Sequence, residues 1–237
     1  MKKIALSSIN EQLRAMGNAK DAAAAQRFFK TGEGEYGEGD KFLGIRVPAL
    51  RQLAKQNLHL VPDDICKLLQ SPFHEERLCA LLIWVYQYAK SDAESRAEIF
   101  RLYLANTGYI NNWDLVDSSA HKIVGPQLYG ENRTLLYQLA GSTSLWERRI
   151  AVIATLHFIQ HDDYEDTVAL AKLLLGDTED LIHKATGWML REVGKRNTTP
   201  LYEFLDTHAG NMPRTMLRYA IEKLTPDQRK HYMGMRQ

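Results

Sequence analysis

The apolar residues of this chain recur at the spacing of an α-helix along most of its length. Residues 74–90 carry one stripe, made of Leu78, Leu81, Leu82, Val85 and Tyr88. Residues 144–159 and 180–195 repeat the pattern, with Ile150, Ile153, Ala154 and Phe158 in the first and Leu181, Ala185, Met189 and Val193 in the second. The alternation of apolar and polar residues that marks a half-buried strand is almost absent. The sequence therefore predicts an all-α fold.

The longer predicted helices also recur along the chain. The basic residues near the starts of four of them are separated by 72, 35 and 30 residues, and these are Arg77, Arg149, Lys184 and Arg214. A further predicted helix, residues 111–125, lies in the middle of the longest interval. A recurrence of about 30 to 37 residues is typical of stacked helix pairs in HEAT and armadillo arrays. We expect a HEAT-like helical-repeat solenoid with a concave groove, as one all-helical domain over residues 1–237 with its array at roughly 10–225. A compact helical bundle with incidental spacing is the alternative.

The cysteines and histidines do not form a recognisable metal site. Cys66 and Cys79 lie thirteen residues apart without a CxxC motif, which argues against a structural zinc site and a disulfide framework. His157 and His161, followed by two aspartates, superficially resemble a metal site. However, His157 lies in an apolar stretch, and His161 lies near a helix end, where imidazole suits the helix dipole. We expect no metal and no cofactor.

Hydropathy and charge bear on location and partners. No stretch approaches the roughly 18 apolar residues of a membrane span, and the apolar run near the N-terminus is too short for a signal peptide. We therefore expect a cytoplasmic protein that makes no membrane contact. The net charge is +1, but from residue 181 onward ten Lys and Arg stand against five Asp and Glu. This basic C-terminal quarter suits a polyanion such as nucleic acid.

Residues 31–40, "TGEGEYGEGD", formally match the GxGxxG pattern of dinucleotide-binding proteins through Gly32, Gly34 and Gly37. That pattern requires a preceding strand, whereas a predicted helix precedes it here. Its acidic residues would also repel a pyrophosphate. We interpret the segment as a flexible acidic loop, with closure of Tyr36 over a ligand as a lesser alternative.

The stretch "INNWDLVDSSAH", residues 110–121, places a tryptophan and two aspartates at the start of a predicted helix. Trp113 and Asp117 are four residues apart and share one face, while Asp114 suits the first turn because of the helix dipole. A carboxylate beside indole rings suits a cationic ligand, and an alkylated purine is one. Cleavage of its glycosidic bond moves positive charge onto the sugar, where a carboxylate stabilises it.

Two other helices combine tryptophan with basic residues. Trp188 shares a stripe with Lys184 and Arg191, and Trp146 is followed by Arg148 and Arg149. Such a surface can follow a phosphate backbone and offer flat rings to bases. Ordinary structural roles remain open for all of these residues. The tryptophans suit a helical core, Asp117 suits a cap or a pair with Lys122 or Arg149, and the cations suit a solvated face.

Four segments resemble the AlkD-type DNA alkylation repair family, the HEAT-like DNA glycosylases. They are "NNWDLVDSS", "LWERRIAVI", "IHKATGWMLREVGKRN" and "KFLGIRVPALRQLAK", and the resemblance covers roughly residues 10–225. The resemblance implies base excision repair of duplex DNA that carries cationic N3- or N7-alkylated purines. It also implies a hydrolase that needs no metal, no base-binding pocket and no flipped base. The expected protein is a monomer that is nucleoid-associated when bound to DNA.

The resemblance also implies roles for particular residues. The family's essential carboxylate falls on Asp117, its two active-site tryptophans on Trp113 and Trp188, and its backbone-binding arginine on Arg149. Further candidates for DNA binding are Arg148, Lys184, Arg191 and Arg214. The chain departs from some relatives at two positions. Asn112 stands where they have a second tryptophan. Phe28 stands where they have a tyrosine, and Tyr36 would then supply the missing hydroxyl. A non-catalytic HEAT-like scaffold that binds DNA or a protein is the alternative function.

Overall fold

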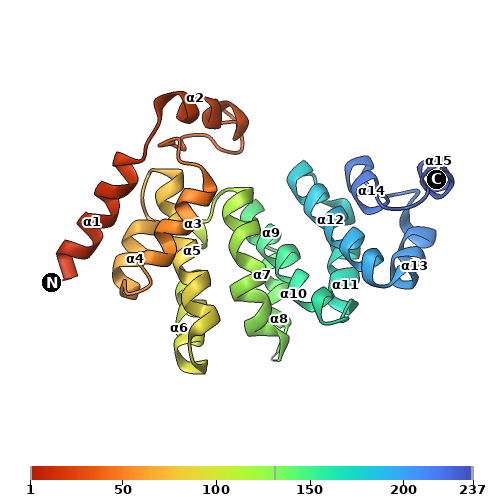
Figure 1. The fold of residues 1–237 in the computed structure, drawn as a ribbon. Coiled ribbons are helices and arrows are strands. Elements are labelled where there is room, and N and C mark those ends of the chain that lie inside the picture. Colours follow the sequence, from red (N-terminus) through yellow and green to blue (C-terminus); the bar gives the residue numbers. More distant parts are fainter. Residues whose placement is uncertain (1, 131, 236–237) are drawn as a thin grey trace. The chain divides into compact units, whose positions relative to one another are not determined.

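The computed structural model describes residues 2–130 and 132–235, and regular structure within them is helical apart from one isolated bridge between Lys41 and Phe73 (Figure 1). The prediction of an all-α helical-repeat fold is therefore confirmed. In the same residues, no helix has the length and apolar character that crossing a membrane requires.

The chain forms two compact units, Met1–Ser119 and Ala120–Gln237. The single domain and the concave groove stay predictions.

The first unit is built around one long buried helix, α5 (His74–Lys90). It packs against α3 and α4 and, through fewer contacts, against α1 and α6. The unit's other helices are α1 (Lys2–Ala15), α2 (Ala19–Phe28), α3 (Val47–Gln56), α4 (Pro62–Leu69), α6 (Ala93–Ala105), η1 (Thr107–Tyr109) and the first part of α7 (Trp113–Tyr129). The stripe predicted for α5 is buried throughout, and at most 6% of any of its residues is exposed. Burial of these apolar side chains stabilises the unit.

The second unit is organised around α12 (Asp180–Arg196), which packs against α9, α11, α13 and α14. Its helices after α7 are α8 (Thr134–Ala140), α9 (Leu145–Ala154), α10 (Leu156–Gln160), α11 (Glu165–Leu173), η2 (Leu174–Gly176), α12, α13 (Thr198–His208), α14 (Arg214–Ala220) and α15 (Pro226–Gly234). The core stripe of α12 differs from the prediction at one position, because Ile182 is fully buried where Leu181 was expected, and Leu181 is only half-buried.

The stretch predicted as one helix over residues 144–159 is divided at Thr155. The Thr155 hydroxyl donates to the carbonyl oxygen of Val152 at 2.7 Å, and α10 begins at the next residue. Hydroxyl groups that bond back to the preceding turn compete with the helix and often bend it. Phe158 is nonetheless fully buried, so the predicted apolar face persists across the break.

Gly187 allows α12 and α14 to approach closely. A Cβ atom at Gly187 would lie 2.4 Å from the carbonyl oxygen of Met216 and 2.6 Å from the Cβ of Tyr219. Gly125 does the same where α7 meets residue 154, whose carbonyl oxygen would lie 2.5 Å from an added Cβ. Side chains at these two positions would force the helices apart.

The acidic segment 31–40 is a chain of turns that its own glutamates close. Glu35 accepts a hydrogen bond from the amide of Gly32 at 2.8 Å, and Glu38 accepts one from the amide of Gly34 at 2.9 Å. These hydrogen bonds give the segment defined turns, and its flexibility stays a prediction. A helix, α2, precedes the segment, where the dinucleotide-binding pattern requires a strand.

Candidate functional site

The helix that carries Trp113 and Asp117 begins at a capping asparagine. The backbone carbonyl of Asn112 accepts a hydrogen bond from the amide of Val116 at 3.2 Å, and its side-chain oxygen accepts one from the amide of Trp113 at 2.8 Å. Asn112 is fully buried, and its side-chain amide donates to Asp40 at 3.3 Å. Asn112, one of the two positions at which the chain departs from some relatives, thus caps α7 and links it to Asp40 at the end of the acidic segment 31–40.

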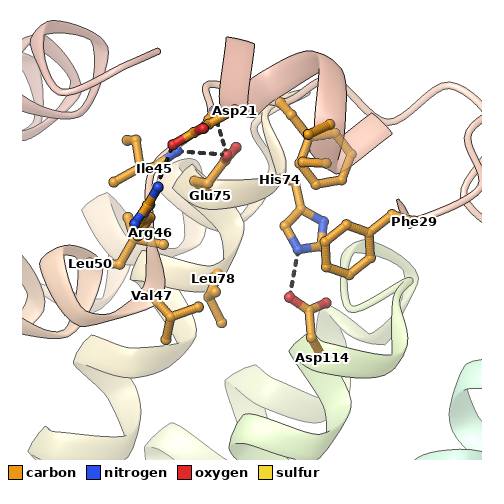
Figure 2. Close-up of a pocket in the computed structure, with 14 residues that line it drawn as sticks. Asp21, Phe29, Ile45, Arg46, Val47, Leu50, His74, Glu75, Leu78 and Asp114 are labelled. Carbon is orange, nitrogen blue, oxygen red and sulfur yellow. Dashed lines mark hydrogen bonds and ion pairs between the residues drawn. The ribbon is translucent and has the colours of Figure 1, made fainter. Parts of the chain in front are cut away.

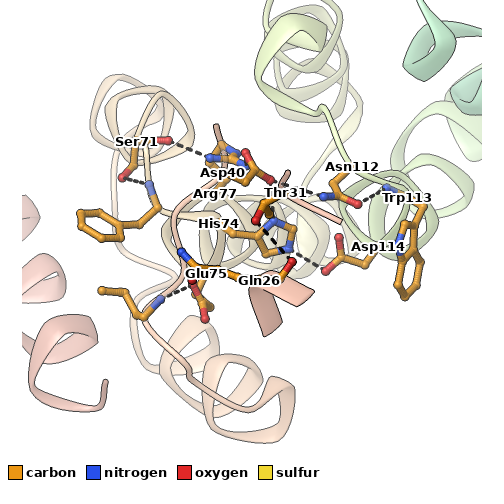
Figure 3. A network of polar contacts seen from close by, with 12 residues as sticks. Gln26, Thr31, Asp40, Ser71, His74, Glu75, Arg77, Asn112, Trp113 and Asp114 are labelled. Atoms are coloured by element: carbon orange, nitrogen blue, oxygen red, sulfur yellow. Dashed lines mark hydrogen bonds and ion pairs between the residues drawn. The ribbon is translucent and has the colours of Figure 1, made fainter. Parts of the chain in front are cut away.

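Asp40 is the centre of a buried ionic network (Figure 3). Arg77 donates to its Oδ1 at 2.6 Å, and Nδ1 of His74 lies 3.2 Å from its Oδ2. The other ring nitrogen of His74, Nε2, lies 2.8 Å from Oδ2 of Asp114. His74 is 2% exposed, Arg77 4% and Asp40 8%. Buried charges are tolerated when they are paired and hydrogen-bonded in this way.

The network keeps His74 protonated at neutral pH. Burial alone would lower the pKa of His74, but its hydrogen bonds to Asp114 and Asp40 outweigh burial and raise the pKa to about 9. Burial would likewise raise the pKa of Asp40, yet the hydrogen bond from His74 and the charge of Arg77 hold it below its usual value. Both imidazole nitrogens of the cation carry a proton, so His74 donates to Asp40 on one side and to Asp114 on the other.

Aromatic rings pack against this network. The Phe29 ring lies 5.3 Å from the Trp113 ring in a stacked arrangement and 4.8 Å from the His74 ring. Phe42 stacks on His74 at 4.7 Å. Phe28, 65% exposed, meets Trp113 edge-on at 6.0 Å. Trp113, the first residue of α7, therefore packs against the end of α2, with part of its surface exposed.

Asp117 lies one helical turn after Trp113, and both are half-buried. Its charge adds to the effect of burial in raising the pKa of the Tyr103 phenol, which bonds to Ser119 at 3.0 Å. Asp114, predicted as the helix-start residue, does lie in the first turn of α7. It is also the partner of His74, and its Oδ1 is buried without a hydrogen-bond partner in the described part of the chain. The two aspartates therefore have different surroundings.

A cavity of about 240 Å³ adjoins the network within the first unit. Its lining includes Phe29, His74 and Asp114, together with aliphatic side chains of α3 and α5 (Figure 2). Glu75 holds one wall in place, because its carboxylate accepts hydrogen bonds from the amides of residues 43, 44 and 45 at 2.8, 2.7 and 3.2 Å. One face of the His74 site thus borders an open space.

The candidate DNA-binding residues all lie in the second unit, where several already have partners. Arg148 donates to Asp177 at 2.7 Å and to two backbone carbonyls, and it is largely buried. Arg149 is 4% exposed and donates to the carbonyl oxygen of Leu181. The other contacts are those of Lys184 with Asp180, Arg191 with Glu192 and Glu222, Arg214 with the Met233 carbonyl, and the Trp188 indole with Glu192.

Sequence reasoning missed the part that Asp40, His74 and Asp114 play together. A signal for His74 and Arg77 was present, because the apolar stripe of residues 74–90 extends back from Leu78 and Leu81 to these two positions. Charged residues on a buried stripe require partners. Their partner Asp40 lies 34 residues before His74, in a loop without periodicity, so the pairing was not readable from the sequence.

Comparisons with known proteins agree with the resemblance found in the motifs. The family model described as DNA alkylation repair enzyme matches residues 9–224. A solved structure, described as a predicted DNA alkylation repair enzyme from Enterococcus faecalis, matches with a TM-score of 0.68 and 20% identity. The match covers 89% of this chain and 98% of that one, and at such identity it shows a shared fold alone. A search of curated proteins found no match.

Proposed function

Because the chain belongs to the family of DNA alkylation repair enzymes, we propose that it is a DNA glycosylase for cationic N3- and N7-alkylated purines in duplex DNA. Its role in alkylation repair follows from the family, and the reaction and the lesion are the proposal. One observation carries it: Trp113 and Asp117 lie one turn apart on α7, with exposed surface, on a helix whose start is fixed by a buried network.

The proposed chemistry uses the charge that the lesion already carries. Alkylation at N3 or N7 makes the purine cationic and weakens its bond to the sugar. That bond breaks with its electron pair passing to the purine, which leaves as a neutral base. The sugar becomes electron-deficient, and the carboxylate of Asp117 stabilises the developing positive charge. A water oxygen then bonds to C1′ of the sugar and releases a proton.

Trp113 would act through the face of its indole ring. Aromatic faces attract cations by about 0.5–2 kcal/mol, depending on how far the site excludes water. Phe29 stacks on the Trp113 ring, which restricts its rotation and keeps it near the lesion without a cost in side-chain entropy on binding. A neutral purine would gain neither this attraction nor that of the carboxylate, so the site favours charged lesions.

For the second unit, we propose that Trp188, Arg191, Arg214 and Lys184 contact DNA. Arg149 is 4% exposed and donates to the carbonyl oxygen of Leu181, so we propose that it reaches a phosphate only after this contact opens on binding. The Lys184–Asp180 pair is 2.8 Å long, and its two side chains are 39% and 57% exposed. Such exposed pairs contribute about 0–1 kcal/mol, so a phosphate can replace the aspartate at little cost. The pair of Arg148 with Asp177 is more deeply buried, at 15% and 6% exposure, so we expect Arg148 to contribute less to DNA binding.

The alternative, a non-catalytic scaffold, does not require a carboxylate where DNA phosphates approach. The test is release of free base from duplex DNA that contains N7-methylguanine, with purified protein and EDTA in the buffer. A glycosylase releases N7-methylguanine under these conditions. Duplex binding without any release would favour the scaffold and contradict the proposal. The cytoplasmic location and the monomeric state stay predictions.

A further inference from the structure

Three separate contacts connect His74 to the start of α7. The first is direct, from Nε2 of His74 to Asp114 at 2.8 Å. The second passes from Nδ1 through Asp40, which also accepts from the side chain of Asn112, the cap of α7. The third is aromatic, since the Phe29 ring packs against both the His74 ring and the Trp113 ring.

Only the doubly protonated imidazole satisfies both polar contacts. A neutral ring has one N–H, so one of its nitrogens would turn a lone pair toward a carboxylate. The charged groups that face His74 are Asp40 from the loop, Asp114 from α7 and Arg77 from its own helix. Glu75 is adjacent in α5, but its carboxylate binds the amides of residues 43–45. Because the pKa of His74 is about 9, the cation is present at neutral pH.

We infer that His74 is a positioning residue: its contacts fix the start of α7 and thereby orient Trp113 and Asp117. Asp117 follows one turn later on the same hydrogen-bonded helix, so a shift of the first turn moves its carboxylate as well. The inference rests on the proposed function for its effect on catalysis. Its structural part concerns Trp113 alone and is measurable without a reaction.

The structural part is tested by NMR on the free protein. The indole N–H signal of Trp113 is assigned by its loss in Trp113→Phe and followed from pH 6 to 10. We expect this signal to shift in wild type with a midpoint near pH 9, and to show no such step in His74→Gln. The exposed His59 provides the matched control, because His59→Gln should titrate like wild type. A Trp113 signal that is the same in wild type and His74→Gln would overturn the inference.

The catalytic part is tested by single-turnover excision of N7-methylguanine. Displacing a catalytic group by removing its support typically lowers the rate about 10- to 100-fold, and we expect a loss of this size for His74→Gln with duplex affinity within about twofold of wild type. The wild-type rate should fall as the pH rises through about 9, whereas the rate of His74→Gln should not. An equal rate and an equal pH profile in the two proteins would overturn the inference.

Rescue by imidazole provides a measurement that loss of folding cannot imitate. His74→Gly removes a side chain that borders the cavity of about 240 Å³, so added imidazole has space to enter. Imidazole should raise the excision rate of His74→Gly and leave that of wild type unchanged. Failure of rescue in a folded variant would contradict the inference. If wild type itself excises nothing, the proposed function fails, and the Trp113 titration still decides the role of His74.

Discussion

Removing Asp40 should destabilise the first unit far more than removing a surface aspartate. Asp40 neutralises Arg77 at 2.6 Å and contacts His74 at 3.2 Å, and both cations are almost fully buried. Asp40→Ala leaves these charges in place without their shared counter-charge. Arg77 keeps one hydrogen bond, to the carbonyl oxygen of Ser71 at 3.1 Å, and His74 keeps Asp114.

The expected loss in the free energy of unfolding depends on the hydrogen bonds that Arg77 and His74 keep. Breaking a buried ion pair by removing one partner costs about 3–5 kcal/mol, because the remaining charge is buried and uncompensated. The partners that remain place the expected cost near the lower end, at about 3 kcal/mol. Asp21→Ala is the matched control, because Asp21 pairs with Arg46 at 3.4 Å, with side chains 39% and 83% exposed. That pair should contribute about 0–1 kcal/mol.

Urea unfolding of wild type, Asp40→Ala and Asp21→Ala at pH 7, followed by far-ultraviolet circular dichroism, measures the stability that each variant loses. If the two units unfold separately, each transition is fitted by itself. We also expect this contribution of Asp40 to stability to depend on pH. Because the pKa of Asp40 is held below its usual value, its contribution is fully present above pH 3.8 and is lost as the pH falls toward the lower folded-state value. An Asp40→Ala loss no larger than that of Asp21→Ala would show that the buried pairs of Asp40 do not stabilise the first unit.

Three further predictions concern the second unit. Gly187→Ala should lower stability by about 1–3 kcal/mol in a thermal melt, because its Cβ would overlap a carbonyl of α14, whereas Gly176→Ala, which meets no atom within 4 Å, should cost less. His157, whose pKa burial and His161 lower to about 4, should make wild type lose stability as the pH falls from 6.5 toward 4. Urea unfolding of His157→Phe should show a weaker loss over that range, and an equal loss would exclude this origin. Arg149→Ala should weaken duplex binding and reduce the slope of log affinity against log salt by about 1, and an unchanged slope would argue against a phosphate contact.

The fold was predictable because its main signal is local. Helical periodicity is contained within each segment, and the stripe from Leu78 to Tyr88 is buried as predicted. The errors arose where tertiary or side-chain contacts override periodicity. Thr155 divides a continuous apolar pattern through its own hydroxyl, and Ile182 replaces its neighbour Leu181 in the core, a one-position difference that periodicity alone resolves poorly.

The candidate site was predictable only in part, for a related reason. Trp113 and Asp117 are neighbours on one helix, so their spacing placed them together. The network that supports them joins residues 34 and 40 positions apart, and no spacing rule connects Asp40 or Asp114 with His74. The pairing of Lys184 with Asp180 was readable, since the two lie one helical turn apart. The pairing of Arg148 with Asp177, 29 positions away, was not readable from the sequence.

We propose above that the carboxylate of Asp117 performs the chemistry of base release. This proposal is tested most directly by measuring single-turnover excision of N7-methylguanine and duplex affinity on the same preparation of Asp117→Asn. Asp227→Asn, a change at an exposed position of α15, is the control and should behave as wild type. We expect Asp117→Asn to lose excision by at least about 100-fold while it binds DNA as tightly as wild type or more tightly. Excision by Asp117→Asn at the wild-type rate would contradict the proposal.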